Sequence, residues 1–343
     1  MRCSRLHALP PYPGGKRRLL GRIFRHLPGA AEAPVFVDPF LGGGAVSLMA
    51  KARGHRVICS DLAERSVIVG RALIENDRVT LTEADTLRFF VPHPDAGRFI
   101  RDNFAPDVLT TKHAAFLDNA LVVARAARGP KRWLFFLLLL KYVLRNRPGG
   151  NFGAKTIVHQ MEVGAWEGMN PHYIRDVLAR TIDGHPKALV DAIRRQVNRG
   201  IFGNGQQNQV HQTDALEFIQ KTAGDILYLD PPYAGTQAYE TALRPLDEIL
   251  AGRRLETERS RFSRKDGLQA LAALLDQAEH FPVWAISYGN RETSLDDLVR
   301  LVEKFRPVQH AEAIRYAHCA GLAGREHRDR NRELLVFARR QDR

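Results

Sequence analysis

The amino-acid sequence predicts an α/β fold, with a parallel sheet, helices on both faces and a mostly helical insertion. The first observation is segment 35–50, in which a short apolar run, a glycine-rich turn and an apolar helical pattern follow one another. The second is a strand pattern over 56–60, spaced as in a βαβ unit, which implies parallel strands. The third is the interval 91–205, which has helical periodicity and almost no strand pattern.

The first βαβ unit has the clearest boundaries. Val35 to Asp38 is an apolar run with β-branched residues, which favours a strand, and Ala45 to Ala50 continues with the apolar spacing of a helix. The second strand ends on Asp61, 23 residues after Asp38. Acids that follow two parallel strands come to the same edge of a sheet, so this edge is a candidate ligand site.

The remaining elements are predicted from periodicity and turn residues. In chain order they are an irregular stretch over 92–112, two helices over 113–146 with a core helix at 133–140, helical pattern over 171–199, strands at 209–212 and 226–229, a charged, mobile stretch over 234–266, a helix at 268–280, a strand at 283–287, a helix near 294–305, and a strand pair at 310–316 and 334–338.

The chain of 343 residues has room for about two domains of roughly 150 residues, or for one α/β domain with a large insertion. The strand patterns lie before residue 91 and after residue 205. We therefore predict an α/β domain formed by residues 1–90 and 206–343, and an inserted, mostly helical domain over 91–205.

Composition excludes several classes of protein. Hydrophobic residues make up 44% and charged residues 26%, which is typical of a folded chain and unlike collagen, disordered or disulfide-scaffold sequences. The longest apolar run is eight residues, too short to cross a bilayer, so a cytoplasmic protein is expected. The three cysteines are far apart, and neither disulfides nor a metal site is expected.

Basic residues exceed acidic ones and are clustered. The formal net charge is +13, and a basic balance of this size indicates a polyanionic partner, with nucleic acid as the first candidate. Residues 1–26 contain seven Lys or Arg and no acid, and residues 125–155 contain eight and no acid. The alternative is that arginine serves here as a general solvated surface residue.

The glycine-rich turn Asp38-Pro39-Phe40-Leu41-Gly42-Gly43-Gly44 is a candidate ligand loop. Its glycines let the backbone approach a ligand and turn sharply into the next helix, which suits a nucleoside-bearing cofactor. The chain lacks the full GxGxxG pattern and any GxxxxGK[ST] pattern, which weakens dinucleotide and P-loop interpretations. Asp61 is placed to accept hydrogen bonds from ribose hydroxyls. The alternative for the glycine-rich turn is a plain tight turn without a ligand, and the alternative for Asp61 is a helix cap.

The segment Asp230-Pro231-Pro232-Tyr233 follows an apolar strand and is the most specific motif in the chain. Its two prolines remove two backbone donors and leave carbonyl oxygens that accept. The Asp230 carboxylate and the Pro231 carbonyl suit a planar amine with two N–H donors, and the Tyr233 ring offers a stacking face. The exocyclic amine of adenine is such a group. The alternative is a Pro-Pro turn after a buried strand.

Five motifs in this order resemble those of the Dam-type DNA adenine methyltransferases. The motifs are Pro11-Tyr12-Pro13-Gly14-Gly15-Lys16, with tyrosine where that family commonly has tryptophan, then Val37 to Gly44, Asp61, His211-Gln212-Thr213-Asp214, and Tyr228 to Tyr233. The resemblance covers about residues 10 to 338. It implies a Rossmann-like methyltransferase sheet in which the cofactor segments precede the recognition domain and the catalytic motif follows it.

The resemblance implies S-adenosylmethionine as the cofactor and the N6 amine of a flipped-out adenine as the methyl acceptor. The implied cofactor residues are Tyr12, Gly14, Gly15, Lys16, Asp38, Phe40, Gly42, Gly44, Asp61, Asp214 and Asp230, and the implied catalytic residues are Asp230, Pro231, Pro232 and Tyr233. Asp85 matches no motif and is predicted to be solvated or to cap a helix.

Double-stranded DNA is the expected partner, and the basic insertion supplies the candidate contacts. Arg and Asn side chains read base edges, whereas Lys and Arg also neutralise phosphates. The candidate DNA-binding residues are Arg145, Asn146, Arg147, Asn151, Lys155 and Arg332, with the loop 204–209 as a second recognition element. A monomer or weak dimer is expected, with or without a cognate restriction endonuclease.

Other substrates stay open at this point. The same acceptor corner fits a cytosine amine, an adenine in RNA or a glutamine side-chain amide. A catalytically silent DNA-binding module is an alternative of another class, against which the intact Lys16, Asp61 and 230–233 argue. A nuclease is disfavoured, because no PD-(D/E)xK-like pattern falls on a strand pair.

Overall fold

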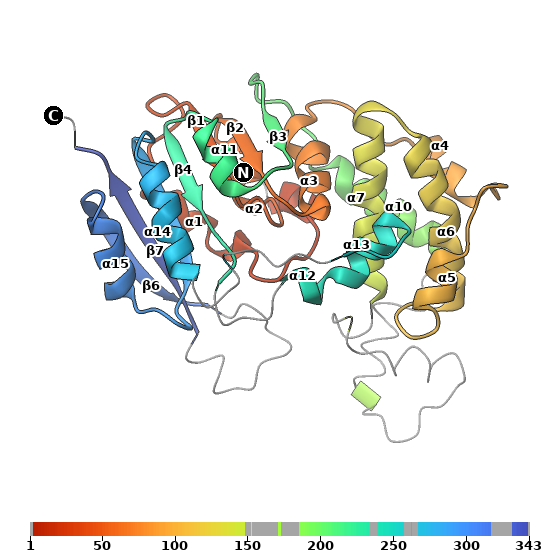
Figure 1. Ribbon diagram of the computed structural model, residues 1–343. Helices are drawn as coiled ribbons and strands as arrows, with labels where there is room; N and C mark the ends of the chain where they lie inside the picture. The colour runs from red at the N-terminus through yellow and green to blue at the C-terminus, as the bar shows by residue number, and fades with distance from the viewer. Residues whose placement is uncertain are drawn as a thin grey trace.

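A seven-stranded sheet forms the centre of the structure, a computed structural model that describes residues 3–147, 152, 171–172, 185–233, 239–256, 262, 267–316 and 331–341. The strands are β1 (Val35–Asp38), β2 (Arg56–Ser60), β3 (Gln209–His211), β4 (Ile226–Leu229), β5 (Val283–Gly289), β6 (Val308–Arg315) and β7 (Arg332–Arg339). They pair in the order β3-β2-β1-β4-β5-β7-β6 (Figure 1). The first five in this order are parallel, and β7 lies antiparallel between β5 and β6.

Helices connect these strands and extend to one end of the sheet (Figure 1). The described helices are η1 (Cys3–Ala8), η2 (Lys16–Arg18), α1 (Leu20–Ile23), α2 (Ala45–Ala52), α3 (Glu64–Gly70), η3 (Arg71–Glu75), α4 (Glu83–Leu87), η4 (Arg88–Phe90), α5 (Phe99–Phe104), α6 (Thr111–Ala126), α7 (Gly129–Asn146), α10 (Pro186–Asn198), α11 (Ala215–Gln220), α12 (Tyr239–Ala242), α13 (Arg244–Ala251), α14 (Gly267–Gln277) and α15 (Leu295–Glu303).

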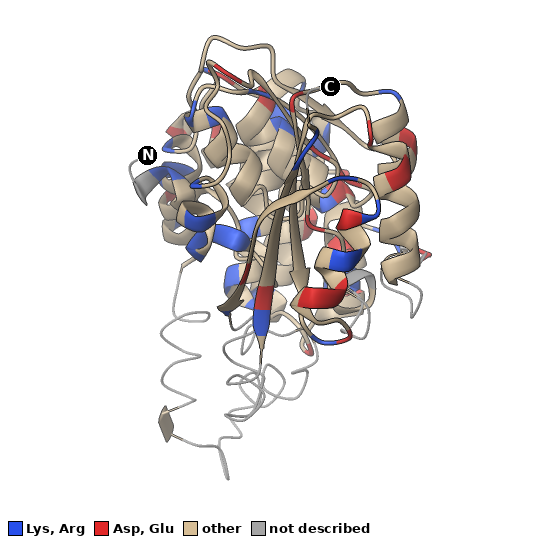
Figure 2. Cartoon of the chain, turned by 90° about the vertical axis from the view of Figure 1, so that its left-hand side faces the viewer, with Lys and Arg blue, Asp and Glu red and all other residues tan. Residues whose placement is uncertain are grey.

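Both faces of the sheet are covered, as predicted. Side chains alternate along each strand, so Phe36 joins the core beneath α1, α2 and α3, whereas Val37 joins the core beneath α11, α14 and α15. Figure 2 shows the sheet nearly edge-on between these two layers, with Lys and Arg more abundant on the layer that carries the N-terminus. The predicted α/β fold class is thus confirmed.

The helical part packs around α7, which contains the predicted core run. Leu134 to Leu144 are all buried, and α7 contacts α3, η3, α6, α10 and α13. The buried residues of α6, α7 and α10 belong to the same hydrophobic cluster as Phe36 of the sheet. One core therefore joins the sheet and the helices, and the domain boundaries at 91 and 205 stay a prediction.

The segment 92–112 was predicted to be irregular and contains α5, so that part of the prediction is wrong; the stretch 234–266, predicted to be charged and mobile, contains α12 and α13. In α5 the N–H groups of Ile100 and Arg101 donate to the carboxylate of Asp118 on α6, at 2.8 and 3.1 Å. In α13, Leu246 and Ile249 are buried, and the helix packs on α7. Both helices depend on tertiary contacts, which a local sequence pattern does not contain.

Asp85 caps a helix, which is one of its two predicted roles. Its carboxylate accepts the Thr82 N–H at 2.8 Å, and Thr82 Oγ1 accepts the Asp85 N–H at 3.1 Å. The two residues form a capping box at the start of α4. Lys131 also donates to Asp85, at 2.7 Å.

Lys51 is a buried cation that holds the end of η3. The side chain is fully buried, and its Nζ donates to the carbonyl oxygens of Leu73, Ile74 and Asn76 at 3.2, 2.8 and 3.1 Å. It also pairs with Asp77 at 2.9 Å. Burial lowers the pKa of Lys51, and Asp77 opposes that shift. The ammonium group therefore replaces the helical partners that the end of η3 lacks.

We expect Lys51→Met to lower the free energy of unfolding by about 2–4 kcal/mol, because it leaves several buried carbonyls without their donor. Lys304→Met is the matched control, since Lys304 is exposed at the end of α15 and should change stability by less than about 0.5 kcal/mol. Urea titrations of both variants measure the difference. Equal stability of the two variants would contradict the anchoring role of Lys51.

Candidate active site

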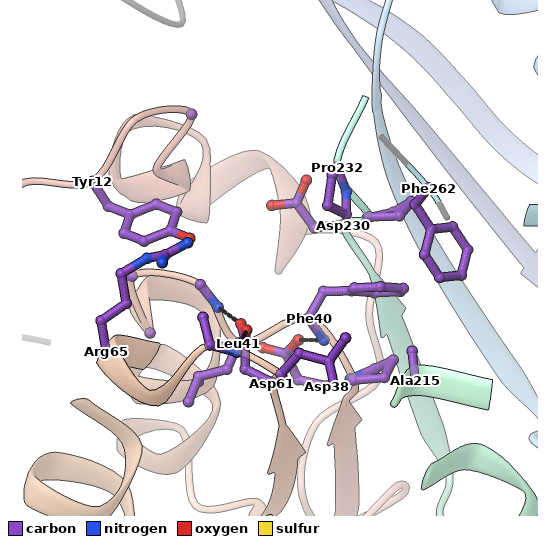
Figure 3. Close-up of a pocket in the computed structure, with 18 of the residues that line it drawn as sticks. Tyr12, Asp38, Phe40, Leu41, Asp61, Arg65, Ala215, Asp230, Pro232 and Phe262 are labelled. Carbon is purple, nitrogen blue, oxygen red and sulfur yellow. Dashed lines mark hydrogen bonds between the residues drawn. The ribbon is translucent and has the colours of Figure 1, made fainter. Parts of the chain in front are cut away.

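A cavity of about 500 Å³ lies at the carboxyl ends of the central strands (Figure 3). Asp38 ends β1, and Asp230 follows β4; both residues line the cavity, together with Asp61 after β2 and Asp214 after β3. The strand order reverses between β1 and β4, because β2 and β3 lie on one side and β4 and β5 on the other. Ligands of open α/β sheets bind at such a reversal.

The glycine-rich turn forms one wall of the cavity. Gly42 and Gly44 have φ angles of +50° and +74°, a backbone region that side chains rarely tolerate. Gly43 lies so close to Tyr12 that an added Cβ would be 2.7 Å from the Tyr12 Cβ. The turn thus carries glycine both for its backbone shape and for the contact with Tyr12.

We expect Gly43→Ala to displace Tyr12 and to weaken S-adenosylmethionine binding by about tenfold or more, as seen by calorimetry. Gly21→Ala is the matched control, because a Cβ at Gly21 meets nothing within 4 Å and should leave the affinity unchanged. If Gly43→Ala binds the cofactor like the wild type, Tyr12 does not shape the cofactor site.

Tyr12 and Arg65 lie together at one end of the cavity (Figure 3). Burial raises the pKa of Tyr12, and the positive charge of Arg65 acts in the opposite direction. Arg65 also forms an ion pair with Asp247 of α13. The N-terminal motif, α3 and α13 are thereby joined at this end of the cavity.

Two acids support the turn from beneath, the buried Asp38 and the partly buried Asp61. Asp38 accepts hydrogen bonds from Ser47 Oγ at 2.6 Å and from the Phe40 N–H at 3.1 Å, yet burial raises its pKa to about 7. Asp61 accepts from the Gly42 N–H at 2.8 Å and from the Ala63 N–H at 2.9 Å. Asp61 therefore ties β2 to the turn, and burial raises its pKa as well.

The other predicted cofactor residues are also brought to the cavity. Phe40 makes an edge-on contact with Phe262, with ring centroids 5.0 Å apart, which gives the cavity an aromatic wall. Asp214 lines the cavity and caps α11 by accepting the Leu216 N–H at 2.9 Å. Gly14 has a φ of +71°.

Asp230 is held on one side by a lysine and a tyrosine. Lys16 Nζ lies 2.9 Å from Asp230 Oδ1, and the Tyr233 hydroxyl lies 2.9 Å from the same oxygen. Lys16 Nζ also donates to the Tyr233 hydroxyl at 2.7 Å and to the Gly14 carbonyl at 2.9 Å. Within the described ranges, the other oxygen of Asp230, Oδ2, receives no hydrogen bond.

Glu333 of β7 completes this cluster and was not predicted from the sequence. It is fully buried, and its Oε1 lies 2.6 Å from the Tyr233 hydroxyl and 3.3 Å from Lys16 Nζ. Ser287 Oγ also donates to Oε1. Burial raises the pKa of Asp230, Lys16 opposes this shift, and Glu333 reinforces it.

The positions of Lys16 and Tyr233 differ from the roles that the sequence suggested. Lys16 lines the cavity but is only 4% exposed and points into the acidic cluster. Tyr233 is also 4% exposed, and its ring lies 5.2 Å from that of Tyr288. Most of the Tyr233 ring is therefore packed within the protein, and only a small part faces the cavity.

Sequence reasoning also missed several cavity residues from distant segments, namely Arg65, Arg244, Asp247, Leu255 and Phe262. None belongs to a recognisable motif. Glu333 did leave a signal, because it is the single acid of the otherwise apolar strand that begins at Arg332.

The candidate DNA-binding residues are placed differently from one another. Arg145 is exposed near the end of α7, whereas Asn146 is 5% exposed and donates to the Tyr142 carbonyl at 2.9 Å. This placement does not support a base contact by Asn146. Arg147 lies over the Phe152 ring at 5.3 Å.

Arg332 begins β7, where its N–H donates to Asn290 Oδ1 at 2.7 Å. Asn151 and Lys155 lie outside the described residues. In the second recognition element, Asn204 donates to the Lys51 and His55 carbonyls at 3.1 and 2.8 Å, so its side chain holds the loop.

One group of metal-ligand types lies outside the cavity. His26, His310 and Glu312 bring their ligand atoms within 4.8 Å of one another. The imidazole rings of His26 and His310 are stacked, with centroids 3.9 Å apart. The Arg22 guanidinium forms an ion pair with Glu312 Oε2 at 2.7 Å. None of the three lines the cavity at β1 and β4.

The strand order, the antiparallel β7 and the cavity at the reversal agree with the Rossmann-like methyltransferase sheet that the sequence resemblance implied. Residues 12–100 match the family model described as D12 class N6 adenine-specific DNA methyltransferase. The chain thus acts as an adenine-specific DNA methyltransferase, and S-adenosylmethionine is its cofactor.

Two curated relatives are Type II methyltransferases. M2.HphI of Haemophilus parahaemolyticus is 25% identical over 344 residues, which covers 96% of this chain and 98% of the relative. M.FokI of Planomicrobium okeanokoites is 25% identical over 232 residues, which covers 60% of this chain and 31% of the relative. A solved S-adenosylmethionine-dependent methyltransferase from Agrobacterium tumefaciens gives a TM-score of 0.35 at 10% identity, over 94% of this chain and 60% of that one.

Among the described residues, no helix combines the length and the apolar character that crossing a membrane requires.

Proposed function

We propose that Asp230 is the acceptor of the substrate amine, and that the enzyme methylates the N6 nitrogen of an adenine flipped out of duplex DNA. The observation that supports this proposal is the asymmetry of the Asp230 carboxylate. Oδ1 is paired with Lys16 and lies 2.9 Å from the Tyr233 hydroxyl, while Oδ2 receives no hydrogen bond from the described residues, and Asp230 lines the cavity. The protein therefore fixes the Asp230 carboxylate through Oδ1 and leaves Oδ2 available to a substrate.

The adenine amine is a poor nucleophile, because its lone pair is delocalised into the ring. Hydrogen bonds from the amine to Asp230 Oδ2 and to the Pro231 carbonyl favour a pyramidal nitrogen whose lone pair points at the methyl carbon. As the N–C bond forms and the methyl–sulfur bond breaks, positive charge develops on the nitrogen, and the carboxylate stabilises it. The electron pair of the methyl–sulfur bond stays on sulfur. The nitrogen then releases one N–H proton to solvent and keeps the electron pair of that bond.

The cavity residues fit S-adenosylmethionine, which supplies an electrophilic methyl carbon on a sulfonium when it is bound. Gly42 and Gly44 form a cradle without side chains, and Asp38 provides a buried acid, which favours a cationic ligand group. Asp61 and Asp214 suit the hydroxyl and amine donors of a nucleoside, and Phe40 and Phe262 suit its ring. These residues bind and orient; the Asp230 cluster acts at the reacting nitrogen.

Double-stranded DNA as substrate is supported by the charge of the chain and by the cavity. A base within a duplex does not reach a cavity of this kind, so it must be flipped out at a cost of about a few kcal/mol. Phosphate contacts by the basic N-terminal layer and by α7 offset that cost. We further propose a cytoplasmic modification enzyme, acting as a monomer or weak dimer, that protects DNA from a cognate restriction endonuclease. The Type II relatives support the pairing with an endonuclease.

We expect Arg145→Ala to weaken binding to the cognate duplex by about 1–3 kcal/mol if Arg145 reads a base edge, with a smaller loss on scrambled DNA. Arg300→Ala is the control, because Arg300 is exposed on α15, in the other layer of the protein. Titrations of both duplexes at several salt concentrations decide the role. Equal losses on the two duplexes would make Arg145 a phosphate contact and place the reading of bases elsewhere.

The proposed substrate is tested by offering labelled S-adenosylmethionine with duplex DNA, RNA or protein under the same conditions. We expect label in duplex DNA alone. Label in RNA or protein instead would overturn the substrate, and cofactor binding without transfer to any of the three would support a silent DNA-binding module.

A further inference from the structure

We propose that Glu333 is a positioning residue for methyl transfer, which keeps the proton of the Tyr233 hydroxyl away from Asp230. This inference rests on the proposed function of Asp230. Glu333 lies on β7, 100 residues after Tyr233, and it is not among the residues that line the cavity. It therefore acts on the substrate only through its neighbours.

The Tyr233 hydroxyl has one proton and two carboxylates within reach, Glu333 Oε1 at 2.6 Å and Asp230 Oδ1 at 2.9 Å. Because it also accepts from Lys16 Nζ at 2.7 Å, the hydroxyl is fixed from both sides. The shorter contact favours donation to Glu333.

Donation to Glu333 leaves Asp230 with Lys16 as its partner. An additional hydrogen bond from Tyr233 would withdraw electron density from the Asp230 carboxylate and weaken it as an acceptor for the substrate amine. Glu333 prevents this competition by being the better-placed acceptor. Ser287 donates to the same oxygen of Glu333 and so fixes its position from β5.

Glu333 also acts through charge. Among the described residues, the cluster contains one buried cation, Lys16, and two acids, the fully buried Glu333 and the partly buried Asp230. The negative charge of Glu333 therefore disfavours a second negative charge on Asp230. Glu333 interacts with several groups of the described residues, among them Lys16, Asp230, Tyr228, Tyr233, Ser287 and Tyr316. Among these, Asp230 is the acid that must be ionised for the amine to bind.

Removing the negative charge of Glu333 shifts the pKa of Asp230 in a predictable direction. Glu333 raises the pKa of Asp230, so Glu333→Gln lowers it. If methyl transfer requires ionised Asp230, the acidic limb of the pH–rate profile moves to lower pH in Glu333→Gln. At the same time, neutral glutamine is a weaker acceptor than the carboxylate, so the Tyr233 hydroxyl donates to Asp230 instead. Asp230 then accepts less strongly from the substrate amine, and the maximal rate falls. A merely structural loss would lower the rate without moving the limb.

The experiment is a single-turnover measurement of methyl transfer to duplex DNA across pH, with cofactor and DNA saturating. For Glu333→Gln we expect a rate roughly ten- to a hundredfold below wild type and an acidic limb at lower pH. Glu333→Asp keeps the charge, so its limb stays at the wild-type position even though the shorter side chain slows the reaction. Cofactor affinity stays within about twofold of wild type in both variants, because Glu333 does not line the cavity.

Glu303→Gln is the matched control, since Glu303 is an exposed acid on α15. Ser287→Ala gives a second line of evidence if Glu333→Gln does not fold, because it leaves the charge in place and removes one donor; we expect a slower rate with an unmoved limb. A Glu333→Gln enzyme, or a Ser287→Ala enzyme in its place, with wild-type rate and profile would overturn the inference. Failure of the wild type to methylate DNA adenine would instead overturn the proposed function.

Discussion

Asp230→Ala is expected to lower the single-turnover rate of methyl transfer about a thousandfold or more, since it removes the acceptor that stabilises charge on the amine nitrogen. The fold should survive, because Lys16 keeps Glu333 as a partner when Asp230 is absent. Rapid-quench assays with saturating duplex DNA and S-adenosylmethionine measure the rate, and circular dichroism checks the fold. Asp276→Ala on α14 is a control outside the cavity.

Retention of more than a few per cent of the wild-type rate in Asp230→Ala would remove this residue from the reaction. Tyr233→Phe is the appropriate companion variant in place of Tyr233→Ala. Tyr233 is buried, so its truncation to alanine would leave a cavity in the core, whereas phenylalanine removes the hydroxyl alone.

Lys16→Met should produce the largest loss of stability among the site variants, about 3–5 kcal/mol in urea titrations. The reason is that Asp230 and Glu333 would be left as buried acids without their cation. Raising the pH should enlarge the loss, since the variant must then keep two like charges close together. Lys221→Met, at an exposed ion pair on the surface, should cost less than about 1 kcal/mol.

The Lys16 variant also separates two roles. The sequence resemblance implied a cofactor contact, whereas the structure places the ammonium among Asp230, Tyr233 and Glu333. If Lys16→Met keeps wild-type stability and loses only affinity for S-adenosylmethionine, the cofactor contact is its main role and the cluster contributes little.

Much of the fold could be predicted because its signals are local. The apolar runs of β1, β2 and β4 and the glycines at 42–44 are each a pattern of a few consecutive residues, and each is confirmed by the structure. The helices α5 and α13 could not be predicted in this way. Their stability comes from Asp118 and from packing on α7, which are contacts between distant segments.

The candidate site likewise contains residues that a local pattern predicts and residues that only contacts between distant segments bring into place. The acids that follow strands could be placed at one edge because parallel strands end together, and Asp38, Asp61 and Asp230 do line one cavity. Glu333 could not be placed, because only the pairing of β7 with β5 brings it beside Tyr233. Asn146 was predicted to contact DNA because of its residue type, but its position in the helical repeat of α7 places its side chain in the core.

Analysis of the nucleosides from methylated DNA tests the central claim most directly. Duplex DNA is incubated with the enzyme and S-adenosylmethionine carrying a labelled methyl group, digested to nucleosides and examined by mass spectrometry. The account predicts that the label is in N6-methyldeoxyadenosine, with cytosine unmodified, and that Asp230→Ala yields no labelled nucleoside above background. Label in N4-methyldeoxycytidine, or equal labelling by wild type and Asp230→Ala, would contradict it.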